Sequence, residues 1–350
     1  MLDNIIMLIK PLDVAAMEKC QLRLDNLTKP LNSLYSFEHI ARQLAGITAN
    51  PRPGNLAKSI IIMAADNGVA EATGAGGEET AQSVGSFCRG NAPVHMFAEH
   101  VNAKLILVDI GVAADLPPLP ELQHAKVAYG TKNMTQGPAM TRQQAVQAIE
   151  TGMEIARRQI AKGVRVLGLG AMGQGGTAPG SAIIACYSDK PLDGLDGQLS
   201  AVIQTALAVN KPDKTDPLDV LSKIGSLAIA GLVGVILGAA AGRAAVVLDG
   251  LATSAAALIA ASLAPEVKHY LIGSHFAVEP AQQTALDLIG IPAYLKLDIT
   301  QGEGVGAALG LSLVKASEHV INDMKTFGEA EVAVAQDGPG ALKQSKDVKD

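Results

Sequence analysis

Aromatic and basic residues are scarce in this chain. Only 3% of its 350 residues are Phe, Tyr or Trp, and Trp is absent. Lys and Arg number 28 against 34 Asp and Glu, so the formal net charge is -6. With neither a basic field nor aromatic rings for base stacking, the composition argues against nucleic acid and against an anionic membrane as partners. We therefore expect small molecules or other proteins as partners.

Cysteine is also rare, and the three residues, Cys20, Cys88 and Cys186, lie far apart. No CxxC pair occurs, so the sequence predicts neither a disulfide framework nor a thiolate metal site. This usage is typical of a reducing compartment, and we expect a cytoplasmic protein. Residues 1–10 combine an early acid with a very short apolar run, unlike a secretory signal. We therefore interpret the chain as unprocessed.

Charged residues make up only 18% of the chain and hydrophobic residues 48%, which excludes an intrinsically disordered protein. One stretch, residues 224–242, carries no charge, and Gly234, Gly238 and Gly242 within it repeat the spacing of packed membrane helices. Two interpretations are open, a membrane-spanning helix and a helix wholly buried in a large core. The second is favoured because the stretch is solitary and runs into another strand-like segment.

Short apolar runs alternate with helix-length segments along most of the chain. In segment 141–162, for example, Thr141 and Gln144 make a capping box and apolar residues recur on one face. Apolar runs that end in Gly, Asp or Ser are typical of parallel strands buried on both faces. The pattern predicts an α/β protein with a doubly wound, mostly parallel, six-stranded Rossmann-like sheet. The six runs are residues 59–65, 104–110, 164–169, 244–249, 269–272 and 292–298.

The two ends of the chain lie outside this alternation. Residues 1–50 and 311–350 are helical in pattern, and we expect them to form one small helical domain. Its last part, from residue 336 onward, is polar and is expected to be a loose tail. Residues 51–310 then form the large α/β domain, which holds the active site.

Ligands of open parallel sheets bind beyond the carboxyl ends of the strands, so residues at those ends are the first candidates for a site. His275, which follows Ser274, is the one histidine considered for a site, with a purely structural role as the alternative. No GxSxG, Gly-Lys-Ser/Thr or HExxH motif occurs, which argues against most hydrolases, NTPases and metalloproteases. The strand ends are Asp66 to Gly68, Asp109 to Gly111, Asp249 with Gly250, Gly273 to His275, and Gln301 to Gly304.

The segment Gly168 to Thr177 is rich in glycine and follows the third apolar run. Glycines allow backbone amides to approach an anion, so the segment is interpreted as a phosphate cradle. Gly168, Gly170 and Gly173 also match the dinucleotide pattern GxGxxG, with Asp189 as a conceivable ribose contact. A tight turn without a ligand is the third interpretation.

Glu303 lies between two glycines just before a helix of small residues. In an apolar cleft, partial desolvation would raise its pKa toward that of a useful general base. The alternative is a solvated acid placed favourably at a helix N-terminus. The flanking glycines favour the first interpretation.

Taken together, motifs spread over nearly the whole chain resemble the nicotinate-nucleotide–dimethylbenzimidazole phosphoribosyltransferases, which activate the lower ligands of cobamides. Singly most of these motifs are unspecific. Where this chain has Asp66-Asn67-Gly68, the family usually has Asp-His-Gly. The motifs are Lys29-Pro30, Ser33-Leu34, residues 43–45, 65–68, 130–134, 137–140, 173–179, 219–225 and 248–250, Ser274-His275, residues 302–304 and residues 306–308.

The resemblance implies transfer of ribose phosphate from nicotinate mononucleotide to an aromatic base, with inversion at the anomeric carbon and release of nicotinate. It implies neither a cofactor nor a metal, and it makes Glu303 the general base. It places substrate or phosphate contacts at Gly170, Met172, Gly173, Gly175, Gly176, Thr177, Ser274, Gly304 and Gly306. It places the base pocket at Asp66, Asn67, Ser83 and Gln301.

Several positions depart from the family pattern. Ala171 stands where the family has a second carboxylate, and no Lys or Arg occurs between Lys190 and Lys211, where the family has a phosphate-binding lysine. Val305 replaces a common serine and Gln301 an apolar residue, and the segment 71–79 is short and rich in glycine. These changes predict weaker phosphate binding and an altered base pocket.

Two hypotheses within the family follow. In the first, this chain and a related chain form a heterodimer that acts on phenolic bases, and this chain alone has little activity. In the second, it is a homodimeric enzyme with an altered base preference. In the second case Lys223 or Lys211 would supply the phosphate contact. An alternative from another class is a Rossmann module that binds a dinucleotide and has no transferase activity.

Overall fold

The structure is a computed structural model that describes residues 2–74, 79–188 and 194–349. Its contacts divide the chain into two units. The large unit comprises residues 1–10 and 58–310, and the small unit comprises residues 11–57 and 311–350. The first ten residues thus belong with the sheet rather than with the helical ends of the chain.

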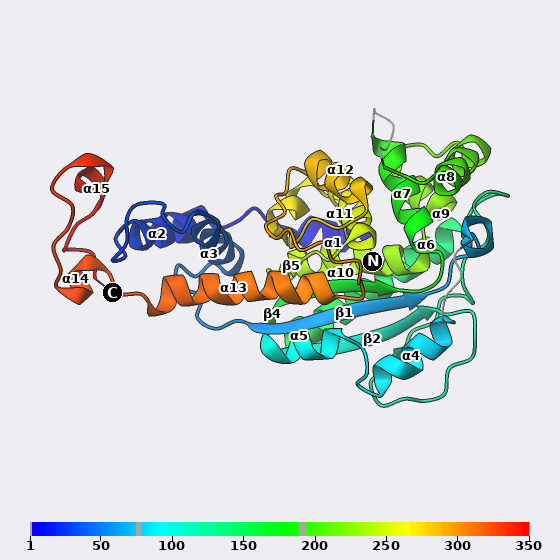
Figure 1. Cartoon of the computed structure of the whole chain (residues 1–350), viewed down its shortest axis with the longest axis horizontal. Coiled ribbons are helices and arrows are strands. Elements are labelled where there is room, and N and C mark those ends of the chain that lie inside the picture. Colours follow the sequence, from blue (N-terminus) through cyan, green and yellow to red (C-terminus); the bar gives the residue numbers. More distant parts are fainter. Residues whose placement is uncertain (1, 75–78, 189–193, 350) are drawn as a thin grey trace. The chain divides into compact units, whose positions relative to one another are not determined.

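The large unit alternates strands and helices (Figure 1). Its strands are β1 (Ala57–Ala65), β2 (Ala103–Gly111), β3 (Leu122–His124), β4 (Val164–Met172), β5 (Ala245–Val247) and β6 (Leu271–Ile272). Its helices are α1 (Leu2–Leu8), η1 (Ala70–Thr73), α4 (Thr80–Cys88), α5 (Val94–His100), α6 (Arg142–Ala161), α7 (Thr177–Tyr187), α8 (Gly197–Asn210), α9 (Pro217–Ile224), α10 (Leu227–Ala241), α11 (Leu251–Leu263), η2 (Pro265–Tyr270), α12 (Pro280–Ile289) and the first part of α13 (Val305–Asp323).

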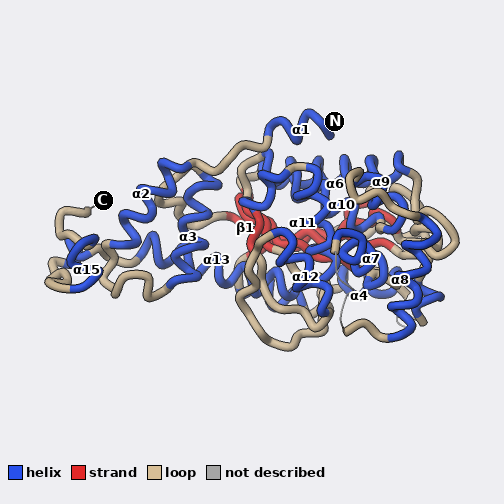
Figure 2. Tube along the Cα trace, turned by 90° about the horizontal axis from the view of Figure 1, so that it is seen from above, coloured by secondary structure: helices blue, strands red, loops and turns tan. Residues whose placement is uncertain are grey.

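The strands form one parallel sheet in the order β3-β2-β1-β4-β5-β6. Figure 2 shows the strands in red with helices around them. The chain builds outward from β1 to β3 in one direction and from β4 to β6 in the other, so the order reverses between β1 and β4. Such a reversal separates the loops that leave two neighbouring strands and creates a crevice at their carboxyl ends. The prediction of a doubly wound, six-stranded α/β sheet is confirmed.

Helices cover both faces of the sheet, as the alternation of side chains along β1 shows. Gly231 of α10 packs against Met63, whereas Gly304, just before α13, packs against Ile60 and Ile62. Because successive residues of a strand point to opposite faces, α10 and the start of α13 lie on opposite sides of β1. Both faces are therefore buried, which explains the unbroken apolar run of this strand.

The predicted run 292–298 is not a strand, and this expectation was wrong. Leu295 forms only an isolated bridge with His275. The neighbouring strand β6 has two residues, and Pro292 has no amide hydrogen to donate, so an extended ladder cannot form there. The sixth strand is β3 at the opposite edge, which the sequence analysis missed because it is short and carries polar residues.

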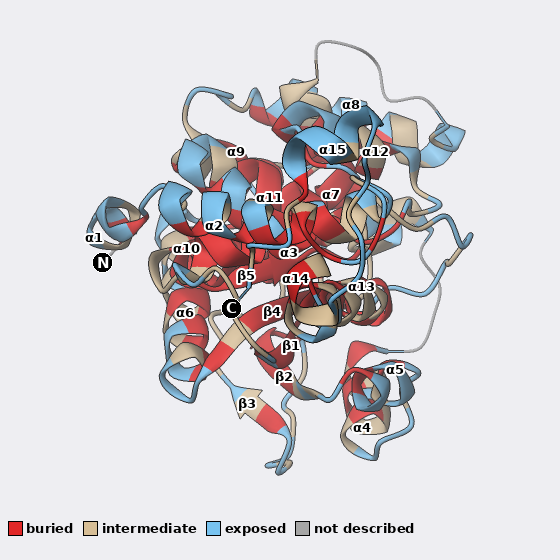
Figure 3. Cartoon of the chain, turned by 90° about the vertical axis from the view of Figure 1, so that its left-hand side faces the viewer, coloured by how far each residue is buried: buried red, intermediate tan, exposed pale blue. Residues whose placement is uncertain are grey.

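Helix α10 accounts for the uncharged stretch 224–242. It has 15 residues, of which only Ala241 is not buried, and it packs against α6, α11 and three strands. Figure 3 shows buried residues concentrated in α10, α11 and the strands. The interpretation as a wholly buried helix is confirmed. Among the described residues, no helix combines the length and apolarity needed to cross a membrane.

The small unit is built around α2 (Val14–Asp25) and α3 (Tyr35–Thr48), together with α13 from residue 311 onward, α14 (Phe327–Ala330) and α15 (Gly338–Lys343). Its core includes Cys20, Leu24 and Ile321. The expected loose tail is instead attached, because Gln344 donates to the carbonyl of Lys29 at 3.1 Å. A polar side chain near the end of the chain thus forms a buried hydrogen bond with the backbone of residue 29.

Candidate active site

A cavity of about 190 Å³ opens at the carboxyl ends of the central strands. Ala65 at the end of β1 and Met172 at the end of β4 line it, as do Asp249 just beyond β5 and His275 beyond β6. Residues 299–303 line it as well. The cavity therefore lies at the reversal of strand order, where a doubly wound sheet binds its ligands.

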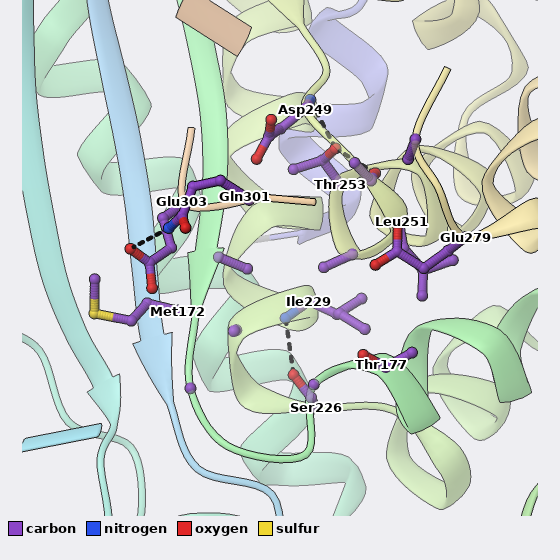
Figure 4. Close-up of a pocket in the computed structure, with 18 of the residues that line it drawn as sticks. Met172, Thr177, Ser226, Ile229, Asp249, Leu251, Thr253, Glu279, Gln301 and Glu303 are labelled. Carbon is purple, nitrogen blue, oxygen red and sulfur yellow. Dashed lines mark hydrogen bonds between the residues drawn. The ribbon is translucent and has the colours of Figure 1, made fainter. Parts of the chain in front are cut away.

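Several helices begin at the wall of this cavity, among them α7 at Thr177, α10 after its N-cap Ser226, and α11 at Leu251 (Figure 4). The Ser226 hydroxyl accepts a hydrogen bond from the Ile229 amide at 3.2 Å, which defines the start of α10. First-turn amides have no partner within their own helix, and the helix dipole makes them positive. Their amides place partial positive charge on part of the cavity wall, where the described lining residues include no Lys or Arg.

The glycine-rich segment differs from the expected loop. β4 continues to Met172, and Gly168 pairs with Val247 inside the sheet, so the turn before α7 comprises only residues 173–176. Gly173 has a φ of 144°, and a Cβ there would lie 1.8 Å from the carbonyl oxygen of Ala65. Glycine is required at this position because β1 passes so close.

This geometry argues against the dinucleotide pattern. In a dinucleotide-binding fold the first glycine forms the tight turn between strand and helix. Here Gly168 and Gly170 are strand residues, and the helix begins only at Thr177. The conceivable ribose contact Asp189 lies outside the described residues.

Glu303 lines the cavity and is partly buried. Its backbone has a φ of 60°, a left-handed conformation that few residues with a Cβ adopt. Gln301 donates a hydrogen bond from Nε2 to its carboxylate at 3.4 Å (Figure 4). The side chain thus comes from a constrained turn directly before α13 and contributes to the cavity wall.

Asp249 places a second carboxylate at the cavity, and this one is buried. Its Oδ2 accepts the Gly304 amide at 2.9 Å and its Oδ1 accepts the Ala307 amide at 3.3 Å. Burial raises the pKa of Asp249 to about 6, because desolvation of the charged form outweighs these hydrogen bonds. Asp249 was expected at a strand end, without a role in the reaction.

Ser274 and His275 form a buried pair beyond β6. The Ser274 hydroxyl lies 3.0 Å from Nδ1 of His275, and burial lowers the pKa of the imidazole. Gly306 packs so closely on this ring that a Cβ there would lie 2.1 Å from Cε1. His275 lines the cavity, whereas Ser274 and Gly306 are not among the described residues that line it.

The residues expected to contact substrate fall into three groups. Those that line the cavity are Asn67, Met172, Gly173, Gly176, Thr177, Gln301 and Glu303. Those that pack behind its wall are Gly170, Ser274, Gly304 and Gly306, of which Gly170 supports the backbone of Glu303 and Gly304, whereas Gly175 packs against Ala70. Asp66 and Ser83 lie elsewhere, Asp66 lining a neighbouring cavity of about 370 Å³ that shares Asn67, and Ser83 on α4.

Asp66 has a structural reason for its place. Its carboxylate accepts the Ala113 amide at 2.7 Å and also the Thr80 hydroxyl, so it ties the ends of β1 and β2 to the start of α4. Ser226, Thr253 and Glu279 line the main cavity although the sequence analysis did not select them. Ser226 precedes α10 as its N-cap residue, and this local pattern was the available signal for it.

The comparisons with known proteins agree with this arrangement. A family profile described as phosphoribosyltransferase matches residues 9–332. The nicotinate-nucleotide–dimethylbenzimidazole phosphoribosyltransferase of Geotalea uraniireducens is 44% identical over 338 residues, which cover 93% of this chain and 96% of the relative. The chain belongs to the nicotinate-nucleotide–dimethylbenzimidazole phosphoribosyltransferase family. The resemblance inferred from the motifs is confirmed.

Other members of the nicotinate-nucleotide–dimethylbenzimidazole phosphoribosyltransferase family support the assignment. The enzyme of that name from Chloroflexus aggregans is 44% identical over 338 residues, covering 93% of this chain and 96% of the relative. The crystal structure of the Thermus thermophilus enzyme matches with a TM-score of 0.87 at 33% identity, covering 92% of this chain and 99% of that chain. Fold and family therefore agree over nearly the whole length.

The structure places the departures from the phosphoribosyltransferase pattern as well. Ala171 and Gln301 line the cavity, whereas Val305 is buried at the start of α13. Lys223 is directed elsewhere, because its Nζ pairs with Asp219 at 2.9 Å and donates to the carbonyl of Lys211 at 3.3 Å. No Lys or Arg is among the described residues that line the main cavity. The suggestion that Lys223 or Lys211 replaces the family's lysine gains no support from this arrangement.

Proposed function

We propose that this chain transfers the phosphoribosyl group of nicotinate mononucleotide to an aromatic base and releases nicotinate. Membership of the phosphoribosyltransferase family supports the reaction class. The observation that carries the proposal is the cavity at the reversal of strand order, which is lined both by Glu303 and by the N-termini of α7, α10 and α11. It offers an acid-base group and an anion-binding surface together.

The helix N-termini provide the phosphate site in this proposal. Gly173 and Gly176 of the turn, the start of α7 at Thr177 and the start of α11 at Leu251 line the cavity. Amides at such positions bind phosphate through hydrogen bonds and the helix dipole. Three acids, Asp249, Glu279 and Glu303, line the same cavity, so we expect the phosphate to bind at the helix starts and away from these carboxylates.

The chemistry requires one proton acceptor. A nitrogen or oxygen of the base attacks C1′ of the ribose while the bond from C1′ to the nicotinate nitrogen breaks, so the configuration inverts from β to α. The electron pair of the broken bond leaves with nicotinate, and the proton of the attacking N–H or O–H passes to the carboxylate of Glu303. Partial burial and the Gln301 hydrogen bond orient this carboxylate.

The acceptor proposed here is phenolic. Gln301 gives the wall an amide where the family pattern has an apolar residue, and an amide pairs with a hydroxyl-bearing ring. Ala171 removes one of the two carboxylates of the family pattern from the same wall. The proposal includes a related chain as heterodimeric partner, with a homodimer as the alternative.

The deciding experiment measures nicotinate release by the purified chain. Nicotinate mononucleotide is supplied with phenol, p-cresol or dimethylbenzimidazole, and the α-linked product is identified by mass spectrometry and NMR. Release that depends on an acceptor supports the proposal, and the preferred acceptor decides the base class. If no acceptor supports release, even when a related chain is added, the proposed function is wrong.

Glu303→Gln tests the proton acceptor. We expect turnover to fall about 10²- to 10⁴-fold, the usual contribution of a general base. Glu279→Gln serves as the comparison, because Glu279 is a carboxylate on the same cavity wall. An equal or larger loss in Glu279→Gln would transfer the role to that residue.

A further inference from the structure

The carboxylate of Asp249 has a distinctive set of partners. It is buried, and it forms no ion pair with a Lys or Arg of the described chain. It accepts the amides of Gly304 at 2.9 Å and Ala307 at 3.3 Å, and the amide of Gly306 also bonds to it. All three amides belong to the segment that directly follows Glu303.

That segment has an unusual backbone. Glu303 has a φ of 60° and Gly304 a φ of 90°, so two successive residues are left-handed. For Glu303 this conformation is disfavoured by contacts of its Cβ with the backbone. Such a conformation persists only where surrounding contacts stabilise it. Here the first of these contacts is the hydrogen bond from the Gly304 amide to Asp249.

Asp249 is itself fixed to the rigid part of the unit. Its amide donates to the Thr253 hydroxyl at 2.9 Å, which anchors it to the first turn of α11 (Figure 4). Gln282 of α12 donates to its carbonyl oxygen at 3.4 Å and to that of His275 at 2.8 Å. The carboxylate therefore connects the end of the sheet to the turn that carries Glu303.

We propose that Asp249 is the positioning residue for Glu303. It holds the amides at the start of α13 and thereby keeps the left-handed turn, and with it the Glu303 carboxylate, in the orientation needed to accept the proton. This inference rests on the proposed function, because it assigns Glu303 to the same proton transfer.

The charge of Asp249 is part of the arrangement. A carboxylate accepts several amides at once, whereas a protonated carboxyl is a weaker acceptor. The titratable groups that face it are Glu279 and Glu303 across the cavity and His275 on the neighbouring loop. Of these, Glu279 raises the pKa of Asp249, and burial lowers the pKa of His275 and so favours its neutral form.

The test compares Asp249→Asn with the wild type. Asn has the same shape, but its NH2 group faces amide donors, so at least one of the three bonds is lost. We expect kcat for nicotinate release to fall about 10²-fold, the cost of misplacing a reacting group, while KM for nicotinate mononucleotide changes less than threefold. A large rise in KM with unchanged kcat would overturn the proposal and make Asp249 a substrate-binding residue.

Two further measurements separate positioning from general damage. The double variant Asp249→Asn with Glu303→Gln should be no slower than Glu303→Gln alone, since residues that act as a unit are not additive. Additive losses would contradict the proposal. Asp196→Asn is the matched control, because Asp196 caps α8 by accepting the Leu199 amide at 2.8 Å and is not among the described cavity residues.

Hydrogen exchange provides a readout that needs no activity. In Asp249→Asn we expect the amides of residues 304–307 to exchange at least tenfold faster, and in Asp196→Asn we expect them to be unchanged. Unchanged protection in Asp249→Asn would refute the positioning role even if the enzyme is active. Faster exchange with a wild type that releases no nicotinate would instead refute the proposed function and leave the structural link intact.

Discussion

Replacing Asp249 by Asn changes the way stability depends on pH. Burial raises the pKa of this carboxyl from 3.8 to about 6. In the range between these values the native protein keeps a proton that the unfolded chain has lost. The stabilisation that this proton gives is complete below pH 3.8 and disappears as pH rises through about 6. At neutral pH the native state therefore carries the full cost of a buried charge.

The magnitude follows from the shift. One pKa unit corresponds to about 1.4 kcal/mol, so a shift of about two units amounts to about 3 kcal/mol over the whole range. Of this, about 2 kcal/mol falls between pH 4.5 and pH 8. Asn does not titrate. The difference in unfolding free energy between Asp249→Asn and the wild type should therefore increase by about 2 kcal/mol from pH 4.5 to pH 8. This increase does not depend on how much the substitution itself stabilises or destabilises the protein.

Urea unfolding followed by circular dichroism measures this difference, since the chain has no Trp for fluorescence. Titrating groups that do not interact with Asp249 behave alike in the two proteins and cancel in the comparison. Asp249→Ser is a second uncharged variant that packs differently, and it should show the same pH-dependent increase with another offset. If either variant keeps a constant offset from the wild type, the carboxyl does not titrate as argued and the reasoning fails.

Two other predictions concern packing and the phosphate. Gly234→Ala should lower the unfolding free energy by about 3 kcal/mol in urea unfolding, because its Cβ would lie 1.9 Å from the Ile149 carbonyl oxygen. In the control Gly197→Ala the Cβ would have nothing within 4 Å, so its unfolding free energy should stay within about 1 kcal/mol of the wild type. Similar effects in both variants would refute the close contact of α6 and α10. Lys223→Met should leave KM for nicotinate mononucleotide within twofold, since Lys223 pairs with Asp219 outside the cavity, and a tenfold rise would show that it reaches the phosphate.

Local pattern was sufficient for most of the fold. Helix α6 begins where the capping box of Thr141 and Gln144 predicts it, and both reciprocal hydrogen bonds are present. β1 is recognisable because a strand buried on both faces needs an unbroken apolar run. Run 292–298 is less apolar, because it contains Lys296 and Asp298, and it lacks a neighbouring strand long enough to pair with; that second property belongs to the neighbour and is not encoded in the run itself.

The site was predictable in part for a related reason. Glu303 and Asp249 both follow apolar runs, so the rule that ligands bind at strand ends selected both. Their connection was not predictable, because the bond from the Gly304 amide to Asp249 joins positions 55 residues apart. Glu279 was missed for the same reason, since nothing near it in the sequence shows that α12 begins at the cavity.

The buried helix α10 has a consequence for how this protein is made. Its 15 residues contain no charged or polar side chain, and its partners β5 and α11 follow it in the chain. A nascent chain that has emerged only as far as α10 therefore exposes a segment as apolar as many membrane spans, with part of its cover not yet synthesised. Heat strengthens the apolar association that aggregates such an intermediate, and low-temperature expression with abundant chaperones should increase the yield of folded protein.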